Sequence, residues 1–204
     1  ALLDFMGDML RRSNNGFTLH ALHVRMVGVD YQSDTDYLRE QCARHKITYH
    51  ERLVSFDADR NEKRTPCFLC SWNRRKTLFE VAQELGCNKI ALGHHLDDAA
   101  ETFLMNLFIE SRIGCFAPVT YLSRKDITMI RPLIHLTEND VELAIKRLNL
   151  PVVKSKCPAD GVTNRQNTKE WVQERCRKDT SFRAKSLNAF QKKDLDGWGL
   201  KNKI

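Results

Sequence analysis

The segment at residues 88–111 most constrains what this chain can fold into. It reads NKIALGHHLDDAAETFLMNLFIES: a short apolar run, a polar turn, then a long apolar stretch. An uninterrupted apolar strand is typical of a parallel sheet with both faces covered by helices. The pattern therefore predicts a strand at residues 88–93 followed by a helix at residues 97–111.

Strand and helix patterns alternate along the rest of the chain. Further strands are predicted at residues 17–30, 48–56, 127–133 and 150–155, and further helices at residues 1–12, 33–47, 71–85, 138–148 and 163–178. This alternation indicates an α/β fold with a doubly wound parallel sheet and helices on both faces. We expect one domain over residues 1–180, then a C-terminal helix and tail at 181–204, mobile after Gln191.

The composition favours a nucleic-acid partner. The 204 residues carry a net charge of +7, and no apolar run approaches the roughly 20 residues of a membrane-spanning helix. Seven cysteines without a signal-peptide pattern favour reduced thiols, and hence a cytoplasmic protein. The helical pattern begins at Ala1 without an initiator methionine, so we expect a further N-terminal segment, including a first strand, upstream of it.

The turn after the apolar strand gathers polar side chains where α/β sheets bind ligands. It holds Gly93, His94, His95, Asp97 and Asp98 at the end of a strand and the start of a helix. Such a helix N-terminus attracts phosphate, and either aspartate is a candidate Mg²⁺ ligand. The alternative is a helix-capping turn with a histidine pair at its rim.

Three cysteines stand in settings that suit metal binding. Cys67 and Cys70 have Cys-x-x-Cys spacing, and Cys157 lies in a loop pattern before the basic helix. Three thiolates without a fourth ligand suit an iron–sulfur cluster with one open iron. A zinc site completed by a histidine and a reversible disulfide remain alternatives. The other four cysteines are predicted to be packing residues: Cys42, Cys87, Cys115 and Cys176.

Basic residues accompany both cysteine segments. They are Arg74 and Arg75 after the thiol pair, Lys154 and Lys156 before Cys157, and Arg165 in the basic helix. Their position beside the candidate metal ligands favours an RNA-phosphate contact, with solvated helix faces as the alternative.

The motifs PCFLCSWNRR, KIALGHHLDDAAETFLMNLF, IRPL and KCPADGVTNRQ resemble those of PP-loop ATP pyrophosphatases of the tRNA 2-thiocytidine synthetase type. The resemblance runs from about residue 1 to about residue 180 and departs in two places. The family's Ser-Gly-Gly-x-Asp-Ser phosphate loop is absent from these residues, which puts ATP hydrolysis by this exact chain in doubt. The second Cys-x-x-Cys that many relatives carry near Cys157 is also missing.

This resemblance implies an ATP-dependent tRNA sulfurtransferase that transfers AMP to a cytosine C2 oxygen and then replaces that oxygen with sulfur. It implies ATP and Mg²⁺ near residues 93–98, and a 4Fe-4S cluster held by Cys67, Cys70 and Cys157. The implied partners are tRNA and a sulfur donor, either a cysteine desulfurase or sulfide.

The sequence leaves several alternatives open. One is a zinc-stabilised tRNA-binding protein without catalysis, with Zn²⁺ in place of the cluster. Another is a different PP-loop ligase, such as a lysidine synthetase. The modified base is undecided, and a homodimer remains an alternative to a monomer.

Overall fold

The computed structural model describes residues 1–14, 16–28, 34–55, 65–153, 157 and 163–199. The chain divides into two compact units, each described here by itself. The first comprises Ala1–Asn88 and Leu148–Asp160, and the second comprises Lys89–Arg147 and Gly161–Ile204. Lys154 and Lys156 lie outside the described residues.

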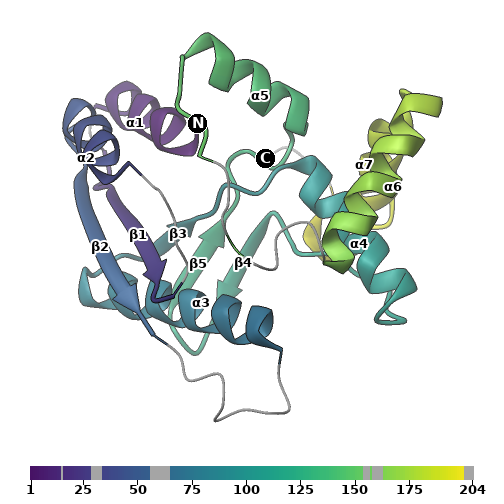
Figure 1. Cartoon of the computed structure of the whole chain (residues 1–204), viewed down its shortest axis with the longest axis horizontal. Helices are drawn as coiled ribbons and strands as arrows, with labels where there is room; N and C mark the ends of the chain where they lie inside the picture. The colour runs from purple at the N-terminus through teal and green to yellow at the C-terminus, as the bar shows by residue number, and fades with distance from the viewer. Residues whose placement is uncertain (15, 29–33, 56–64, 154–156, 158–162, 200–204) are drawn as a thin grey trace. The chain divides into compact units, whose positions relative to one another are not determined.

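The first unit is built on a pair of parallel strands. β1 (His20–Met26) pairs with β2 (Thr48–Val54) in parallel, with His20 opposite Thr48 and Met26 opposite Val54. Figure 1 shows the two strands running side by side in one direction. Helices α1 (Leu2–Arg12), α2 (Thr35–Arg44) and α3 (Pro66–Glu84) complete the unit, and α3 packs against both strands.

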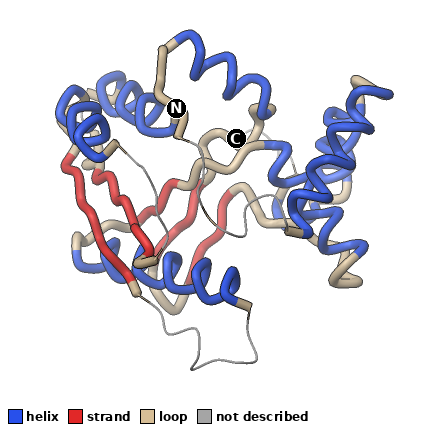
Figure 2. Tube along the Cα trace, in the orientation of Figure 1, coloured by secondary structure: helices blue, strands red, loops and turns tan. Residues whose placement is uncertain are grey.

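The second unit contains a three-stranded sheet in the order β3-β5-β4. β3 (Lys89–Ala91) pairs in parallel with β5 (Ile127–Ile130), whereas β4 (Val119–Leu122) pairs with β5 in the antiparallel sense. The helices of this unit are α4 (Leu96–Phe108), α5 (Glu138–Arg147), α6 (Asn164–Lys178) and α7 (Phe182–Lys192). Figure 2 shows these helices in blue and the strands in red.

The α/β class and most elements agree with the sequence prediction, but β1, β2 and β3 are shorter than predicted and the later strands differ further. β4 was not predicted, and it adds an antiparallel strand to a sheet that was expected to be parallel throughout. β5 ends at Ile130, three residues before the predicted limit. The predicted strand at residues 150–155 is wrong for its described part, because residues 150–153 form no strand.

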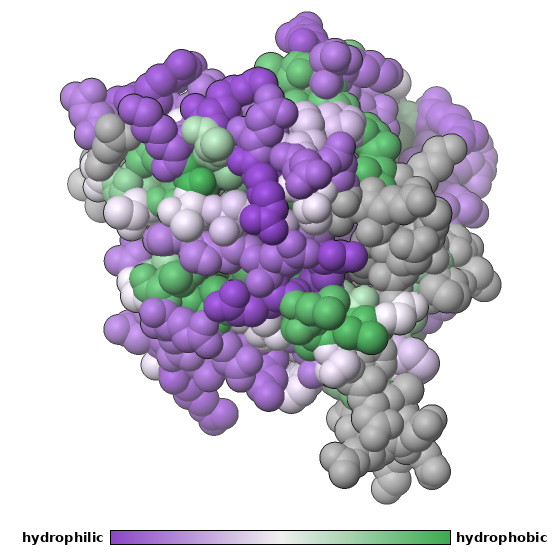
Figure 3. Space-filling model, turned by 60° about the vertical axis from the view of Figure 1, so that its left-hand side comes forward, coloured by the Kyte–Doolittle hydropathy of each residue, from purple (hydrophilic) through white to green (hydrophobic). Residues whose placement is uncertain are grey.

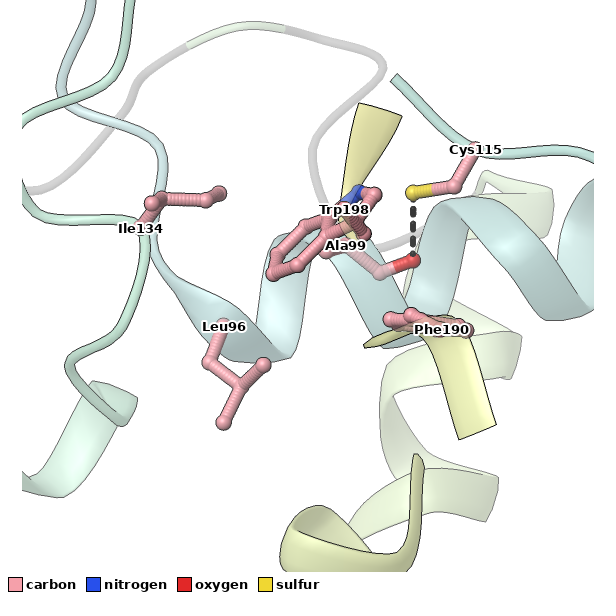
Figure 4. Close-up of a cluster of buried hydrophobic side chains, with 6 residues drawn as sticks. All are labelled: Leu96, Ala99, Cys115, Ile134, Phe190 and Trp198. Carbon is pink, nitrogen blue, oxygen red and sulfur yellow. Dashed lines mark hydrogen bonds between the residues drawn. The ribbon is translucent and has the colours of Figure 1, made fainter. Parts of the chain in front are cut away.

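The core of the second unit joins α4 to the C-terminal segment. Its buried residues are Leu96, Ala99, Cys115, Ile134, Phe190 and Trp198 (Figure 4). The Trp198 indole Nε1 donates a hydrogen bond to the carbonyl of Phe116 at 3.0 Å, and the Cys115 amide donates to an oxygen of Asp196 at 2.6 Å. The prediction of a mobile tail after Gln191 is therefore wrong up to Gly199, because Trp198 is only 3% exposed.

The core of the first unit is smaller. Leu10 of α1, Cys42 of α2 and Ile47 are buried together. Cys42 and Cys115 thus serve as packing residues, as the sequence predicted, and burial raises the pKa of both thiols, to about 12 for Cys115.

Candidate functional site

The thiol pair lies inside a helix. The sequence predicted that a helix would begin at Ser71, after both cysteines, but α3 begins at Pro66. Thr65 caps it, because its hydroxyl oxygen accepts a hydrogen bond from the Phe68 amide at 3.3 Å, and proline is favoured in the first turn. Cys67 and Cys70 are therefore three residues apart on one side of α3, with Cys67 exposed and Cys70 half-buried.

Cys157 belongs to the same unit as the thiol pair and lies close enough to affect it. Burial raises the pKa of the Cys70 thiol, Arg74 opposes this rise, and negative charge on Cys157 or Cys67 adds to it. The three thiols come from two distant segments of the chain, and the charges of Cys67 and Cys157 both act on Cys70. Nevertheless, no three His, Cys, Asp or Glu side chains of the described residues already form a metal-binding group.

The donor set fits an iron–sulfur cluster on chemical grounds. Thiolate sulfur is the usual protein ligand of such clusters. The three thiols that are electrostatically coupled are the same three that the sequence singled out, and Cys67 and Cys157 remain at least partly accessible.

The two arginines after the thiol pair are exposed on α3. Arg74 follows Cys70 by one helical turn, and its charge also lowers the pKa of His23, for which burial is the larger cause. Arg74 thus places fixed positive charge near Cys70, and Arg75 is the next residue of the helix. Figure 3 shows hydrophilic side chains over most of one face of the molecule, with hydrophobic ones in smaller groups.

The histidine turn of the second unit connects β3 to α4, and most of its acidic groups have protein partners. The His95 amide donates to one Asp98 oxygen at 2.9 Å, and Arg165 Nη2 donates to the other at 2.6 Å. Asp97, 2% exposed, accepts a hydrogen bond from the Glu138 amide at 2.7 Å and pairs with Arg183. This geometry favours the capping interpretation for Asp98 and does not fit Mg²⁺ coordination by Asp97 or Asp98.

Two buried ring nitrogens in this turn lack a hydrogen bond within the described part of the chain, although His95 Nδ1 lies 4.0 Å from an Asp97 oxygen. The Nδ1 atoms of His94 and His95 are buried and form no hydrogen bond with the described residues. Burial lowers the pKa of His94, whose ring lies 5.0 Å from that of Phe116. Buried polar atoms normally have partners, so these nitrogens and the exposed Gly93 backbone suit contact with a bound ligand.

The structure adds charged residues that the sequence analysis missed. Glu101 of α4 is 4% exposed, and one of its oxygens lies 3.4 Å from Arg165 Nε. Lys169 pairs with Glu138, and Arg183 with Asp97. Glu101 follows Asp97 and Asp98 by about one helical turn, so the three acids lie on one side of α4. This spacing was the sequence signal that could have identified Glu101.

One cavity in the second unit has a volume of about 430 Å³ and is lined by Thr102, Met105, Asn106, Glu110, Arg112 and Arg165. Another, of about 280 Å³, is lined by Gln173, Cys176, Arg177 and Arg183. Of the predicted site residues, only Arg165 lines either cavity.

A family model described as the PP-loop domain matches residues 1–178. The chain belongs to the PP-loop family. This match confirms the family predicted from the thiol and histidine motifs. None of the described helices of this PP-loop chain is long and apolar enough to cross a membrane.

Two curated relatives have the same name. The tRNA-cytidine(32) 2-sulfurtransferase of Geobacter sulfurreducens is 35% identical over 171 residues, which are 81% of this chain and 65% of that protein. The tRNA-cytidine(32) 2-sulfurtransferase of Geobacter metallireducens is 30% identical over 195 residues, which are 93% of this chain and 75% of that protein. The chain therefore spans about two thirds to three quarters of these relatives.

A solved structure has a similar fold. The U34-tRNA thiolase NcsA from Methanococcus maripaludis, determined with its 4Fe-4S cluster, matches with a TM-score of 0.69 and 25% sequence identity. The match covers 92% of this chain and 66% of that chain. The predicted resemblance to tRNA-thiolating PP-loop proteins is thus supported by both sequence and fold.

Proposed function

We propose that this chain is part of an ATP-dependent tRNA thiolase that converts a cytidine, the counterpart of cytidine 32 in the named relatives, to 2-thiocytidine. The observation that carries the proposal is that the fold places Cys67, Cys70 and Cys157 in one unit, with Cys157 close enough for its charge to act on Cys70. The similarity to two tRNA-cytidine(32) 2-sulfurtransferases supports the choice of base. The reaction takes place in the cytoplasm, where reduced thiols persist.

The reaction has two balanced steps. The cytosine C2 oxygen attacks the α-phosphorus of ATP, a C–O–P linkage forms, and pyrophosphate leaves. Hydrosulfide then attacks C2, a C–S bond forms, the C2–O bond breaks, and AMP leaves with the original oxygen. Gly93, His94 and His95 contact the phosphates of the nucleotide, and no step is assigned to Mg²⁺ at Asp97 or Asp98.

The three cysteines hold the sulfur-delivering group. Cys67, Cys70 and Cys157 ligate a 4Fe-4S cluster, which when bound supplies an open iron for activating sulfur. The hydrosulfide comes from sulfide itself, or from the persulfide of a cysteine desulfurase after two thiols have reduced it and formed a disulfide. Arg74 and Arg75 bind tRNA phosphate next to this group. Lys154 and Lys156, and separately Arg165 of the second unit, are further proposed contacts for tRNA phosphate. The oligomeric state is a separate question, and the molar mass of the purified chain in solution distinguishes a homodimer from a monomer.

The experiment is a nucleoside analysis of cellular tRNA. Deleting the gene for this chain should remove 2-thiocytidine from the tRNA, and the unchanged gene should restore it. A gene carrying Cys67→Ala should fail to restore it, whereas Cys87→Ala, a half-buried cysteine outside the thiol group, should succeed. Protein levels are measured by immunoblot in each strain.

Other results would contradict the proposal in distinguishable ways. Loss of lysidine with normal 2-thiocytidine would identify a lysidine-type ligase, especially if Cys67→Ala and Cys157→Ala retained activity. Loss of 2-thiouridine would change the base but keep the chemistry. Unchanged nucleosides, with one zinc ion and tight RNA binding by the purified chain, would identify a non-catalytic tRNA-binding protein.

A further inference from the structure

Helix α3 exposes a row of aromatic and basic side chains. Phe68, Trp72 and Lys76 follow one another at intervals of four residues, so they lie along one side of the helix. Phe68 is 44% exposed and Trp72 is 52% exposed. Lys76 Nζ lies 5.7 Å from the centre of the Trp72 ring and 3.7 Å from a carboxylate oxygen of Glu80. We call Phe68, Trp72 and Lys76 the aromatic–basic row.

The row and the thiol pair lie on different sides of the first turns of α3. Successive residues of a helix are rotated by about 100°, so Cys67 and Cys70 lie roughly 140–160° around the helix axis from Trp72. Arg75 falls between the thiol side and the aromatic–basic row by the same rotation. An RNA strand that lies on Trp72 therefore reaches the side of the proposed sulfur-delivering cysteines by passing around the helix across Arg75.

Phe68 and Trp72 are not among the buried residues of α3. The residues of α3 that are buried are Leu69, Val81 and Ala82, and α3 packs against β1 and β2. Phe68 and Trp72 leave much of their apolar surface in water, and covering that surface with a ligand would be energetically favourable. Large half-exposed rings beside positive charge are typical of surfaces that bind unpaired bases of nucleic acid.

We propose that the aromatic–basic row is a stacking platform for an unpaired base of the substrate RNA. This proposal rests on the proposed function, because chemistry at a base requires that the base leave its helical stack. The Trp72 ring provides the stacking face, and Lys76 and Arg75 provide positive charge for the adjoining phosphates. The charge also argues against a second copy of this chain as the occupant, because each copy has a net charge of +7.

The test compares two RNAs of equal length and charge, a hairpin with an unpaired loop and a fully paired duplex. The purified chain without added iron is titrated into each fluorescently labelled RNA. Trp72→Ala should weaken binding of the hairpin about tenfold or more, with little effect on the duplex. Trp72→Phe should recover most of the affinity, because it keeps an aromatic face. Tyr121→Ala serves as the control, since Tyr121 is a 60% exposed ring in the β4–β5 hairpin of the other unit.

Three results would overturn the platform. The first is unchanged hairpin binding by Trp72→Ala, and the second is an equal loss of binding to both RNAs. The third is a change of molar mass in Trp72→Ala, which would identify a protein interface instead. Iron binding by the same variant is measured separately, so failure to bind a cluster would count against the proposed function and leave the stacking result intact.

Discussion

At the scale of single residues, Glu101 is a buried acid whose protonation depends on its surroundings. It is 4% exposed on α4, and burial raises the pKa of its carboxyl from 4.5 to about 7 even though the charge of Arg165 opposes the rise. Between these two pH values Glu101 is protonated in the folded chain and ionised in the unfolded chain. The resulting contribution to stability is present below about pH 4.5 and is lost as the pH rises to about 7.

We therefore expect Glu101→Gln to stabilise the chain at alkaline pH. At pH 8 the substitution removes a buried charge and should raise the free energy of unfolding by about 1–3 kcal/mol. At pH 5, where Glu101 is protonated in the folded chain, the effect should be much smaller. Urea unfolding at both pH values measures this difference, with the exposed Glu142→Gln as the control. An equal effect of Glu101→Gln at both pH values would contradict the assigned pKa.

Sequence reasoning identified the polar turn at residues 93–98 but not the partners of its two aspartates. The residue types at 93–98 marked the end of a strand, and their capping alternative was recognisable from the acids in the first helical turn. The partners of Asp97 and Asp98 were not recognisable, because Glu138, Arg165 and Arg183 come from later segments. A local pattern cannot specify such long-range ion pairs.

At the scale of elements, α3 places the thiol pair in a regular helix. The sequence predicted that this helix begins only at Ser71, after both cysteines. Thr65 and Pro66 were the overlooked start signal: threonine favours the capping position and proline the first helical turn. The spacing of Cys67 and Cys70 is therefore fixed by helical geometry rather than by a flexible loop.

This interpretation predicts that Thr65→Ala loosens the first turn of α3. Loss of the cap should cost about 1 kcal/mol, which corresponds to roughly fivefold faster hydrogen exchange at the Phe68 amide if that amide exchanges by local opening. Thr65→Ser should preserve slow exchange because it keeps the hydroxyl. Thr163→Ala removes the equivalent cap of α6, whose acceptor is bonded to the Gln166 amide, and should leave Phe68 unchanged. Unaltered Phe68 exchange in Thr65→Ala would show that the cap does not hold this turn.

At the scale of the whole molecule, the sequence predicted the α/β class from periodicity but not the contacts that complete each unit. Trp198 illustrates the limit: the segment around it has no period, yet its ring packs against Phe190 at a centroid distance of 5.4 Å. β4 was missed for a related reason, since its four residues are too short to show alternation. Such contacts depend on distant parts of the chain.

The functional proposal depends on one tertiary feature, which is that Cys157 lies near Cys70. Sequence spacing identified Cys67 and Cys70 as a pair, and only the fold brings the third thiol near them. Three ligands from two distant segments would make cluster binding a property of the folded unit.

The most direct test is the iron and sulfide content of the chain after anaerobic reconstitution. We predict a brown protein with about four iron and four sulfide ions per chain. Cys157→Ala should lose most of both ions, whereas Cys87→Ala should retain them. A colourless protein that holds zinc, or a Cys157→Ala variant with undiminished iron and sulfide, would contradict the claim that these three cysteines bind one cluster.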